Sequence, residues 1–179
     1  KLDPPILIPQ YGLKTMYSDK LGYVWFGTDE GIKLASKGPK YFKSFLTDQP
    51  VPVSCRGITE DHQGNLYVFT LAGEFIFSHG NIDSNEKTKP RKGYAIGAIT
   101  AADGHIWLSQ EGASCIRYNP ITGESKTYDF GIGLVPYFAG WSIKQIRSGQ
   151  ILIGSTKGLW IKNPRDEVNP VPFDKLNGF

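Results

Sequence analysis

The sequence has few of the residues that hold metals, disulfide frameworks or membrane helices. Its 179 residues include only two cysteines, Cys55 and Cys115, and three scattered histidines, His62, His79 and His105. Neither cysteine has a CxxC partner, so there is no disulfide scaffold, although a single bridge stays open in an oxidising compartment. Without ligand spacing among the histidines, we expect no zinc and no cofactor. No run of 18 apolar residues could span a bilayer.

Strong charge of one sign is also missing. Lys and Arg number 20 against 17 Asp and Glu, a net charge of +3. A protein that binds nucleic acid concentrates its basic residues on one element. Here the densest basic run, 87–92, contains a proline and is typical of a solvated loop. We therefore expect no nucleic-acid partner.

Catalytic motifs and targeting segments are missing as well. The sequence contains no Gly-x-Ser-x-Gly, no phosphate-binding glycine loop and no His-Glu-x-x-His, which argues against an enzyme. It carries no signal peptide and begins with Lys1. We expect a mature or excised piece whose targeting information lies elsewhere.

Turn residues and aromatic residues are plentiful. The 21 glycines and 12 prolines make up about 18% of the chain, above the usual level of roughly 12%. Aromatic residues account for 13%. Helix signals are nearly absent, and this composition is typical of a turn-rich β protein with buried aromatic side chains.

Internal repetition is the strongest pattern in the sequence. Four segments share a turn, an apolar run, a second glycine turn and another strand: 19–35, 61–77, 102–118 and 147–162. Their first glycines, Gly22, Gly64, Gly104 and Gly149, are spaced by 42, 40 and 45 residues. The later glycines Gly31, Gly73, Gly112 and Gly158 are spaced by 42, 39 and 46. Two glycine series with one period indicate a true repeat.

Each repeat predicts four antiparallel strands in about 40 residues. In the turns we expect Asp19 and Asp61 to bond backbone two residues on, while glycine accepts positive φ. The apolar runs do not alternate, so both faces of the second strand should be buried. Four-stranded units of this kind are propeller blades. The fold class is therefore all-β, with about four blades in one partial β-propeller, over repeats 11–50, 51–92, 93–134 and 135–176.

Three further expectations follow from the blade pattern. Trp25 and Trp107 lie within apolar runs and should wedge between blades, whereas Trp160 follows a turn and should be partly exposed. The polar segment 78–93 should be a disordered excursion that replaces an outer strand connection, with a partner-docking loop as the alternative.

Residues 19–32 resemble the two-component regulator propeller repeat, whose consensus is Asp-x-x-Gly-aromatic-Ile-Trp-Ile-Gly-Thr-x-x-Gly-Leu. Residues 149–159 match its second half, while Tyr67 replaces the Trp of the second repeat. The resemblance implies the periplasmic sensor region of a hybrid two-component histidine kinase, anchored in the membrane through its parent protein and often responsive to carbohydrate. Such propellers usually have seven blades. Four blades would therefore self-associate or pack against further blades to cover their open faces.

Loops at one end of the propeller supply the candidate ligand-binding residues. These loops enter the inner strands or join the second and third strands, and they contain Asp29, Glu30, Arg56, Glu111, Tyr137, Phe138, Trp141 and Lys157. Charged groups beside aromatic groups suit sugars, acidic oligosaccharides or another small ligand. We expect no catalytic and no metal-binding residues among them.

Two other functions remain open. The chain could be a structural or protein-interaction propeller of a surface or secretion protein. It could also be an enzyme like the streptogramin lyases, which share short repeats of this kind and need a histidine, acidic residues and a metal on one face. The three histidines offer little support for that chemistry, so a non-enzymatic sensor module is preferred.

Overall fold

A computed structural model describes residues 12–35, 42–47, 53–78, 85–88, 95–132, 139–165 and 169–173. This part of the chain is all-β, with four sheets of four strands and no α-helix. In chain order the strands are β1 (Leu13–Ser18), β2 (Val24–Thr28), β3 (Gly31–Ala35), β4 (Phe42–Phe45), β5 (Cys55–Glu60), β6 (Leu66–Thr70), β7 (Gly73–Phe77), β8 (Asn85–Thr88), β9 (Ala95–Thr100), β10 (Ile106–Gln110), β11 (Ser114–Tyr118), β12 (Ser125–Asp129), β13 (Gly140–Gln145), β14 (Ile151–Ser155), β15 (Gly158–Lys162) and β16 (Val171–Pro172).

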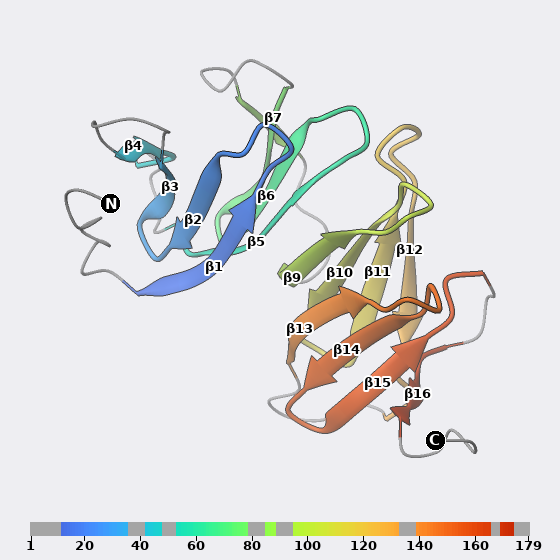
Figure 1. The fold of residues 1–179 in the computed structure, drawn as a ribbon. Coiled ribbons are helices and arrows are strands. Elements are labelled where there is room, and N and C mark those ends of the chain that lie inside the picture. Colours follow the sequence, from blue (N-terminus) through green and yellow to red (C-terminus); the bar gives the residue numbers. More distant parts are fainter. Residues whose placement is uncertain are drawn as a thin grey trace, which may run out of the picture.

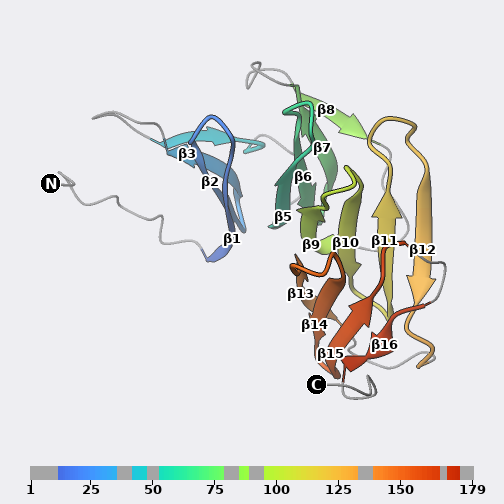
Figure 2. The ribbon, with the colours of Figure 1, turned by 45° about the vertical axis from the view of Figure 1, so that its right-hand side comes forward.

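The sheets are propeller blades. Each consists of four consecutive antiparallel strands in sequence order, so the first strand is innermost and the fourth outermost. The blades follow one another around an arc, with the first and fourth at its two ends (Figure 1). Figure 2 shows the second, third and fourth blades side by side. The prediction of an all-β protein with four four-stranded propeller blades is confirmed.

The first glycine turn of each repeat joins the inner strand to the second strand. Gly22 adopts φ 78°, a conformation that favours glycine, and its N–H donates to the Asp19 carbonyl at 3.0 Å. The Asp19 carboxylate accepts from the Tyr23 N–H at 2.8 Å and from Trp25 Nε1 at 2.8 Å. Asp19 therefore orders its turn as predicted, but it reaches four residues along the chain rather than two.

Three apolar cores fill the spaces between consecutive blades. The first contains Trp25 and Phe77, the second Tyr67 and Tyr118, and the third Trp107 together with blade-four residues such as Ile153. Trp25, Tyr67 and Trp107 occupy the same repeat position, and each packs toward the following blade. The predicted wedging of Trp25 and Trp107 is confirmed, because they are only 2% and 0% exposed.

Two predictions about aromatic and polar segments were wrong. Trp160 is buried rather than partly exposed, because its ring stacks on Phe130 with centroids 5.0 Å apart. Part of segment 78–93 is not an excursion but strand β8, since Asn85–Thr88 pair with Phe77–Glu74 of β7. Backbone pairing thus recruits a polar stretch as an outer strand. Cys55 and Cys115 are both buried and free, so they form no disulfide bridge.

Hydrogen bonds also connect blades at the ends where these turns lie. The Glu60 carboxylate of the second blade accepts the Lys20 N–H of the first at 3.0 Å. The Gln145 side chain of the fourth blade accepts the Ala102 N–H of the third at 2.8 Å. Lys20 and Ala102 occupy the same repeat position, so one device recurs at two of the three interfaces. At the second interface the Thr59 and Thr100 hydroxyls are 2.9 Å apart.

Candidate functional site

A β-bulge begins each inner strand. The pairing of each inner strand with its neighbour skips one residue near its start, and the skipped residues are Lys14, Arg56, Ile96 and Trp141. A bulge leaves a residue out of the ladder and re-aims its side chain. We call these four side chains the bulge ring. They belong to one repeat position, eight residues before the first glycine of each repeat.

The bulge ring lines a cavity that all four inner strands share. The cavity measures about 400 Å³, within the range of about 300–1,000 Å³ typical of small-ligand pockets. Besides the ring it is lined by Leu13, Thr15, Gly97, Ala98, Ser142 and Ile143. The bulge ring thus contributes two cations, one aliphatic side chain and one indole to a hollow at one end of the propeller.

Lys14 is held by a carboxylate beside the cavity. Its Nζ lies 3.0 Å from Asp29 Oδ2, and the other oxygen of Asp29 accepts the Ser54 hydroxyl at 2.8 Å. The hydrogen bond from Ser54, then that from Lys14, lowers the pKa of Asp29 below its usual value. Asp29 is therefore an anion at neutral pH that joins the first blade to the second.

Arg56 is the cavity cation without a hydrogen-bond partner. Its Nε is buried, and no group of the described residues accepts a hydrogen bond from it. The nearby Asp29 carboxylate acts on it only through electrostatic attraction. Buried donors are normally satisfied by protein, water or ligand. Arg56 therefore offers the cavity a guanidinium that is free to bind an anion.

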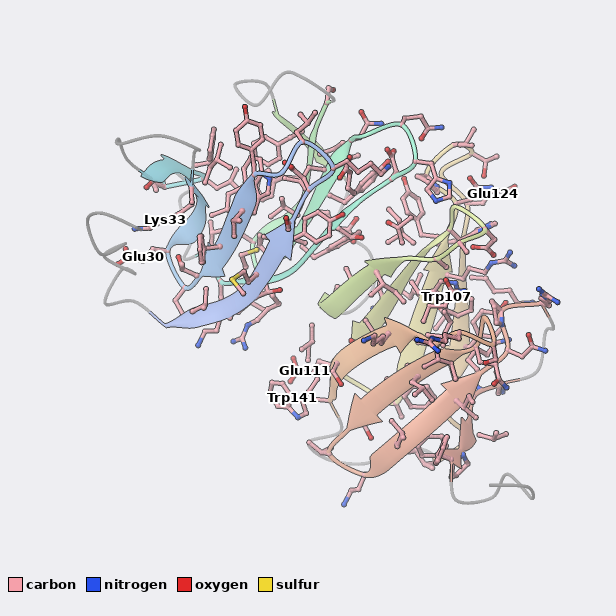
Figure 3. All side chains as sticks on the ribbon, in the orientation of Figure 1. Glu30, Lys33, Trp107, Glu111, Glu124 and Trp141 are labelled. Carbon is pink, nitrogen blue, oxygen red and sulfur yellow. The ribbon has the colours of Figure 1, made fainter. Side chains whose placement is uncertain are left out.

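Trp141 supplies the aromatic surface of the ring. Its side chain is 57% exposed, although a tryptophan buries a large apolar area when it packs. Figure 3 shows it at the inner end of the fourth blade, beside Glu111. Half-buried Ile96 adds an aliphatic wall from the third blade.

The structure brings together some of the predicted ligand residues. Arg56 and Trp141 line the cavity, and Asp29 reaches it through Lys14. Glu111 forms an isolated β-bridge with Ala139, two residues before Trp141, and so lies at the same end of the propeller.

Other predicted residues are not in the cavity. Glu30 lies on the side of the first blade away from Trp141 (Figure 3). The Glu30 and Lys157 backbones instead complete hairpin turns, donating N–H groups to the Thr28 and Ser155 hydroxyls at 3.2 and 3.1 Å. Tyr137 and Phe138 lie outside the described residues.

Sequence reasoning missed Lys14 and Ile96. Their constant distance from the first glycine of each repeat would have revealed them, but a bulge has no composition signal that separates it from regular strand. The same offset also selects Arg56 and Trp141. The sequence predicted both as loop residues, whereas they lie within strands β5 and β13, because each inner strand begins before its bulge.

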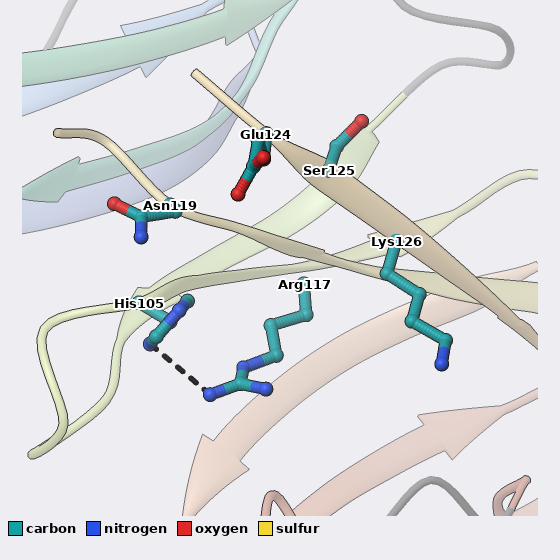
Figure 4. Close-up of a pocket in the computed structure, with 6 residues that line it drawn as sticks. All are labelled: His105, Arg117, Asn119, Glu124, Ser125 and Lys126. Atoms are coloured by element: carbon teal, nitrogen blue, oxygen red, sulfur yellow. Dashed lines mark hydrogen bonds between the residues drawn. The ribbon is translucent and has the colours of Figure 1, made fainter. Parts of the chain in front are cut away.

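A second hollow lies near the turn end of the third blade. It measures about 420 Å³ and is lined by His105, Arg117, Asn119, Glu124, Ser125 and Lys126 (Figure 4). Arg117 Nη2 lies 3.3 Å from both Asp103 Oδ2 and His105 Nδ1, although its Nε makes no hydrogen bond. The terminal nitrogen of this guanidinium already has protein partners, unlike Arg56, so the hollow is the weaker candidate. Among the described residues no three His, Cys, Asp or Glu side chains group as metal ligands.

Comparisons with known proteins show the fold. Neither protein-family models nor curated proteins give a match. Among solved structures, the extracellular domain of the BT4673 one-component system of B. thetaiotaomicron shares 19% identity with TM-score 0.71, over 91% of this chain and 22% of that one. A streptogramin B lyase shares 18% identity with TM-score 0.71, over 93% and 56%. The extracellular domain of the BT3049 hybrid two-component system of B. thetaiotaomicron shares 18% with TM-score 0.67, over 85% and 22%. The chain thus spans between about a fifth and just over half of the length of these proteins.

Proposed function

We propose that the chain is a non-enzymatic ligand-binding module of an extracytoplasmic sensor. The observation that carries this proposal is the bulge ring, in which four equivalent residues from four blades face one cavity. The bulge position of the four repeats adds nothing to core packing. It holds Lys14, Arg56, Ile96 and Trp141. Their chemistry instead suits a sugar-like ligand with polar edges and an apolar face.

Two structural neighbours support a sensory role. Both are extracellular domains of one- or two-component systems, and the sequence resembles the propeller repeat of such receptors. We infer that this module lies in the periplasm as part of a membrane-anchored histidine kinase. In the part of the chain that the structure describes, no helix has the length and apolar character needed to cross a membrane.

The streptogramin lyases share the fold, but the residues of this cavity give less support to a lyase-like activity. Of the three histidines, His62 and His105 lie at the turn end, whereas the bulge ring lies at the other end of the inner strands. His79 lies outside the described residues. Among the described residues, the lining of this cavity has cations and an indole but no acid–base pair.

We also propose that further propeller blades, or a second copy of the chain, cover the open ends of the arc. The first and fourth blades stand at the two ends of the arc (Figure 1), so each presents one face that no other blade of the described residues covers. Light scattering after size exclusion tests this. A dimer or larger species supports packing between copies, whereas a stable monomer would overturn self-association and leave only further blades of a longer protein.

Ligand binding itself is tested with a panel of mono- and oligosaccharides. Tryptophan fluorescence of the full chain should change with a saturable dependence on at least one sugar, and Trp141→Ala should abolish that response. Trp141 is well exposed, so this variant should keep the fold, which circular dichroism checks. A panel without any saturable response would overturn the proposed function.

A further inference from the structure

We propose that the ligand of the bulge ring is an acidic sugar whose carboxylate binds Arg56 and whose ring packs on Trp141. This inference rests on the proposed function and deepens it by naming the ligand class. It assigns a polar anchor from the second blade and an apolar platform from the fourth blade to the same cavity.

The anchor follows from the state of Arg56. Its guanidinium lines the cavity, its Nε is buried, and no hydrogen bond within the described residues satisfies it. A guanidinium presents donors in a fixed fork that matches a carboxylate in two-point contact. A neutral hydroxyl would satisfy only part of this fork and would add no opposite charge to that of Asp29.

The platform follows from the other half of the ring. Trp141 is 57% exposed, and half-buried Ile96 lies in the same lining. An indole held open to a cavity packs against the C–H face of a sugar ring, which a small inorganic anion lacks. The occupant should therefore carry both a charge and a ring of monosaccharide size.

Replacing Asp29 tests whether the cavity prefers an anionic ligand, because the preference predicts the direction in which the affinity changes. Its carboxylate holds Lys14 at 3.0 Å and opposes the approach of another anion. Replacing it with asparagine keeps an oxygen that can accept the Ser54 hydroxyl, while it removes the negative charge and releases Lys14. Binding of an anion should then become tighter, an outcome that damage to the fold would not produce.

The experiment compares D-glucuronate with D-glucose, which share a ring and differ in the carboxylate, by calorimetric titration of the full chain. Wild type should bind glucuronate at least tenfold more tightly than glucose. Arg56→Gln should weaken glucuronate binding about tenfold to a hundredfold, the range expected for a charge-assisted hydrogen bond, and leave glucose binding unchanged. Asp29→Asn should strengthen glucuronate binding about threefold, consistent with one charge acting through a largely aqueous path.

Lys144→Gln is the matched control. Lys144 is an exposed cation on β13, three residues beyond Trp141, and it does not line the cavity. Glucuronate affinity should not change in this variant. An equal loss in Lys144→Gln and Arg56→Gln would mean that general charge attracts the acid, which overturns the assignment of Arg56.

The remaining outcomes separate this inference from the proposed function. If glucose or another neutral sugar binds through Trp141 as tightly as glucuronate, the module binds ligands but the acidic class is wrong. If inorganic phosphate binds through Arg56 as tightly as glucuronate, the site recognises an anion and the sugar ring is wrong. If neither acidic nor neutral sugars bind, both proposals fail.

Discussion

Asp19 and Ala101 occupy the same position of two repeats. Because their side chains differ, two buried indoles differ in whether their N–H group is hydrogen-bonded. Trp25 Nε1 donates to Asp19 at 2.8 Å, whereas Trp107 Nε1 is buried and makes no hydrogen bond in the described residues. Otherwise the turns agree, since the Gly22 and Gly104 N–H groups donate to the Asp19 and Ala101 carbonyls at 3.0 and 2.9 Å. The first repeat satisfies its indole and the third does not.

This difference predicts opposite effects of two substitutions on stability. Asp19→Ala should lower the free energy of unfolding by about 1–3 kcal/mol, because it leaves a buried donor unsatisfied. Ala101→Asp should raise it by about 1 kcal/mol by giving Trp107 an acceptor. Denaturant unfolding measures both. A destabilised Ala101→Asp variant would show that the third turn cannot accept the side chain of the first.

Asp29 makes a prediction about pH at the same scale. Its depressed pKa means that its ionised form stabilises the fold at pH above the usual aspartate pKa, and that this stability is lost as the pH falls through the lowered value. Ser54→Ala should raise the pKa of Asp29 toward its usual value, since the Ser54 hydroxyl is the main cause of the shift. Carboxyl-carbon NMR titration checks this. An unchanged pKa would mean that Lys14 alone stabilises the anion.

At the scale of the strand, close approach between blades decides where a side chain fits. Gly27 of β2 and Gly154 of β14 occupy the same repeat position, but only Gly27 faces another blade. A Cβ on Gly27 would lie 2.6 Å from Thr15 Cγ2 and 2.7 Å from Cys55 Sγ. On Gly154 it would meet only the side chain of exposed Ser142, whose hydroxyl would lie 2.5 Å away.

The two alanine substitutions should therefore differ. Gly27→Ala should cost about 1–3 kcal/mol through overpacking between the first two blades. Gly154→Ala should cost less than about 0.5 kcal/mol, because the Ser142 side chain can rotate away. Thermal and denaturant unfolding of the pair measures this difference. Equal costs would contradict the assignment of Gly27 to a packed interface.

The strands were largely predictable because glycine turns mark their ends. The turn glycines Gly22 and Gly31 bracket β2, and their equivalents bracket the second strand of every other repeat. Strand β8 was not predictable, because polar Asn85–Thr88 pair through backbone N–H and C=O groups that every residue except proline provides. Trp160 was misjudged for a related reason: its partner Phe130 is 30 residues away in the sequence, so no local pattern reveals the stack.

The candidate site was predictable only in part. The topology argument pointed to the end of the propeller at which the cavity lies, and the chemistry of charged and aromatic residues selected Arg56 and Trp141. The bulges that turn these side chains and Lys14 toward the cavity depend on register between strands, which single residues do not encode. The charges of Glu30 and Lys157 suggested ligand binding. Their backbone N–H groups instead donate to hydroxyls in the same hairpin turns, so these loops have a structural role.

For the whole molecule, the three separate cores imply that interfaces open independently. Cys55 lies in the core between the first two blades and Cys115 in the core between the last two. Burial raises the pKa of both thiols, that of Cys115 to about 12, so neither forms the reactive thiolate near neutral pH. Each thiol can therefore report when its own interface opens.

Iodoacetamide labelling at pH 8 measures this opening. Both thiols should react slowly in the native protein and rapidly in denaturant. Gly27→Ala should speed labelling of Cys55, followed in a Cys115→Ala background, and leave that of Cys115, followed in a Cys55→Ala background, unchanged. Equal acceleration of both would show that the blades open as one cooperative unit.

The most direct test of the ligand site is NMR mapping of D-glucuronate binding to the full chain. Saturable shifts should concentrate on Arg56 Nε–H, the Trp141 indole N–H and the backbone of Lys14 and Ile96, while His105 and Arg117 stay unchanged. Shifts centred on the hollow around Arg117, or no saturable shift anywhere, would contradict the assignment of ligand binding to the bulge ring.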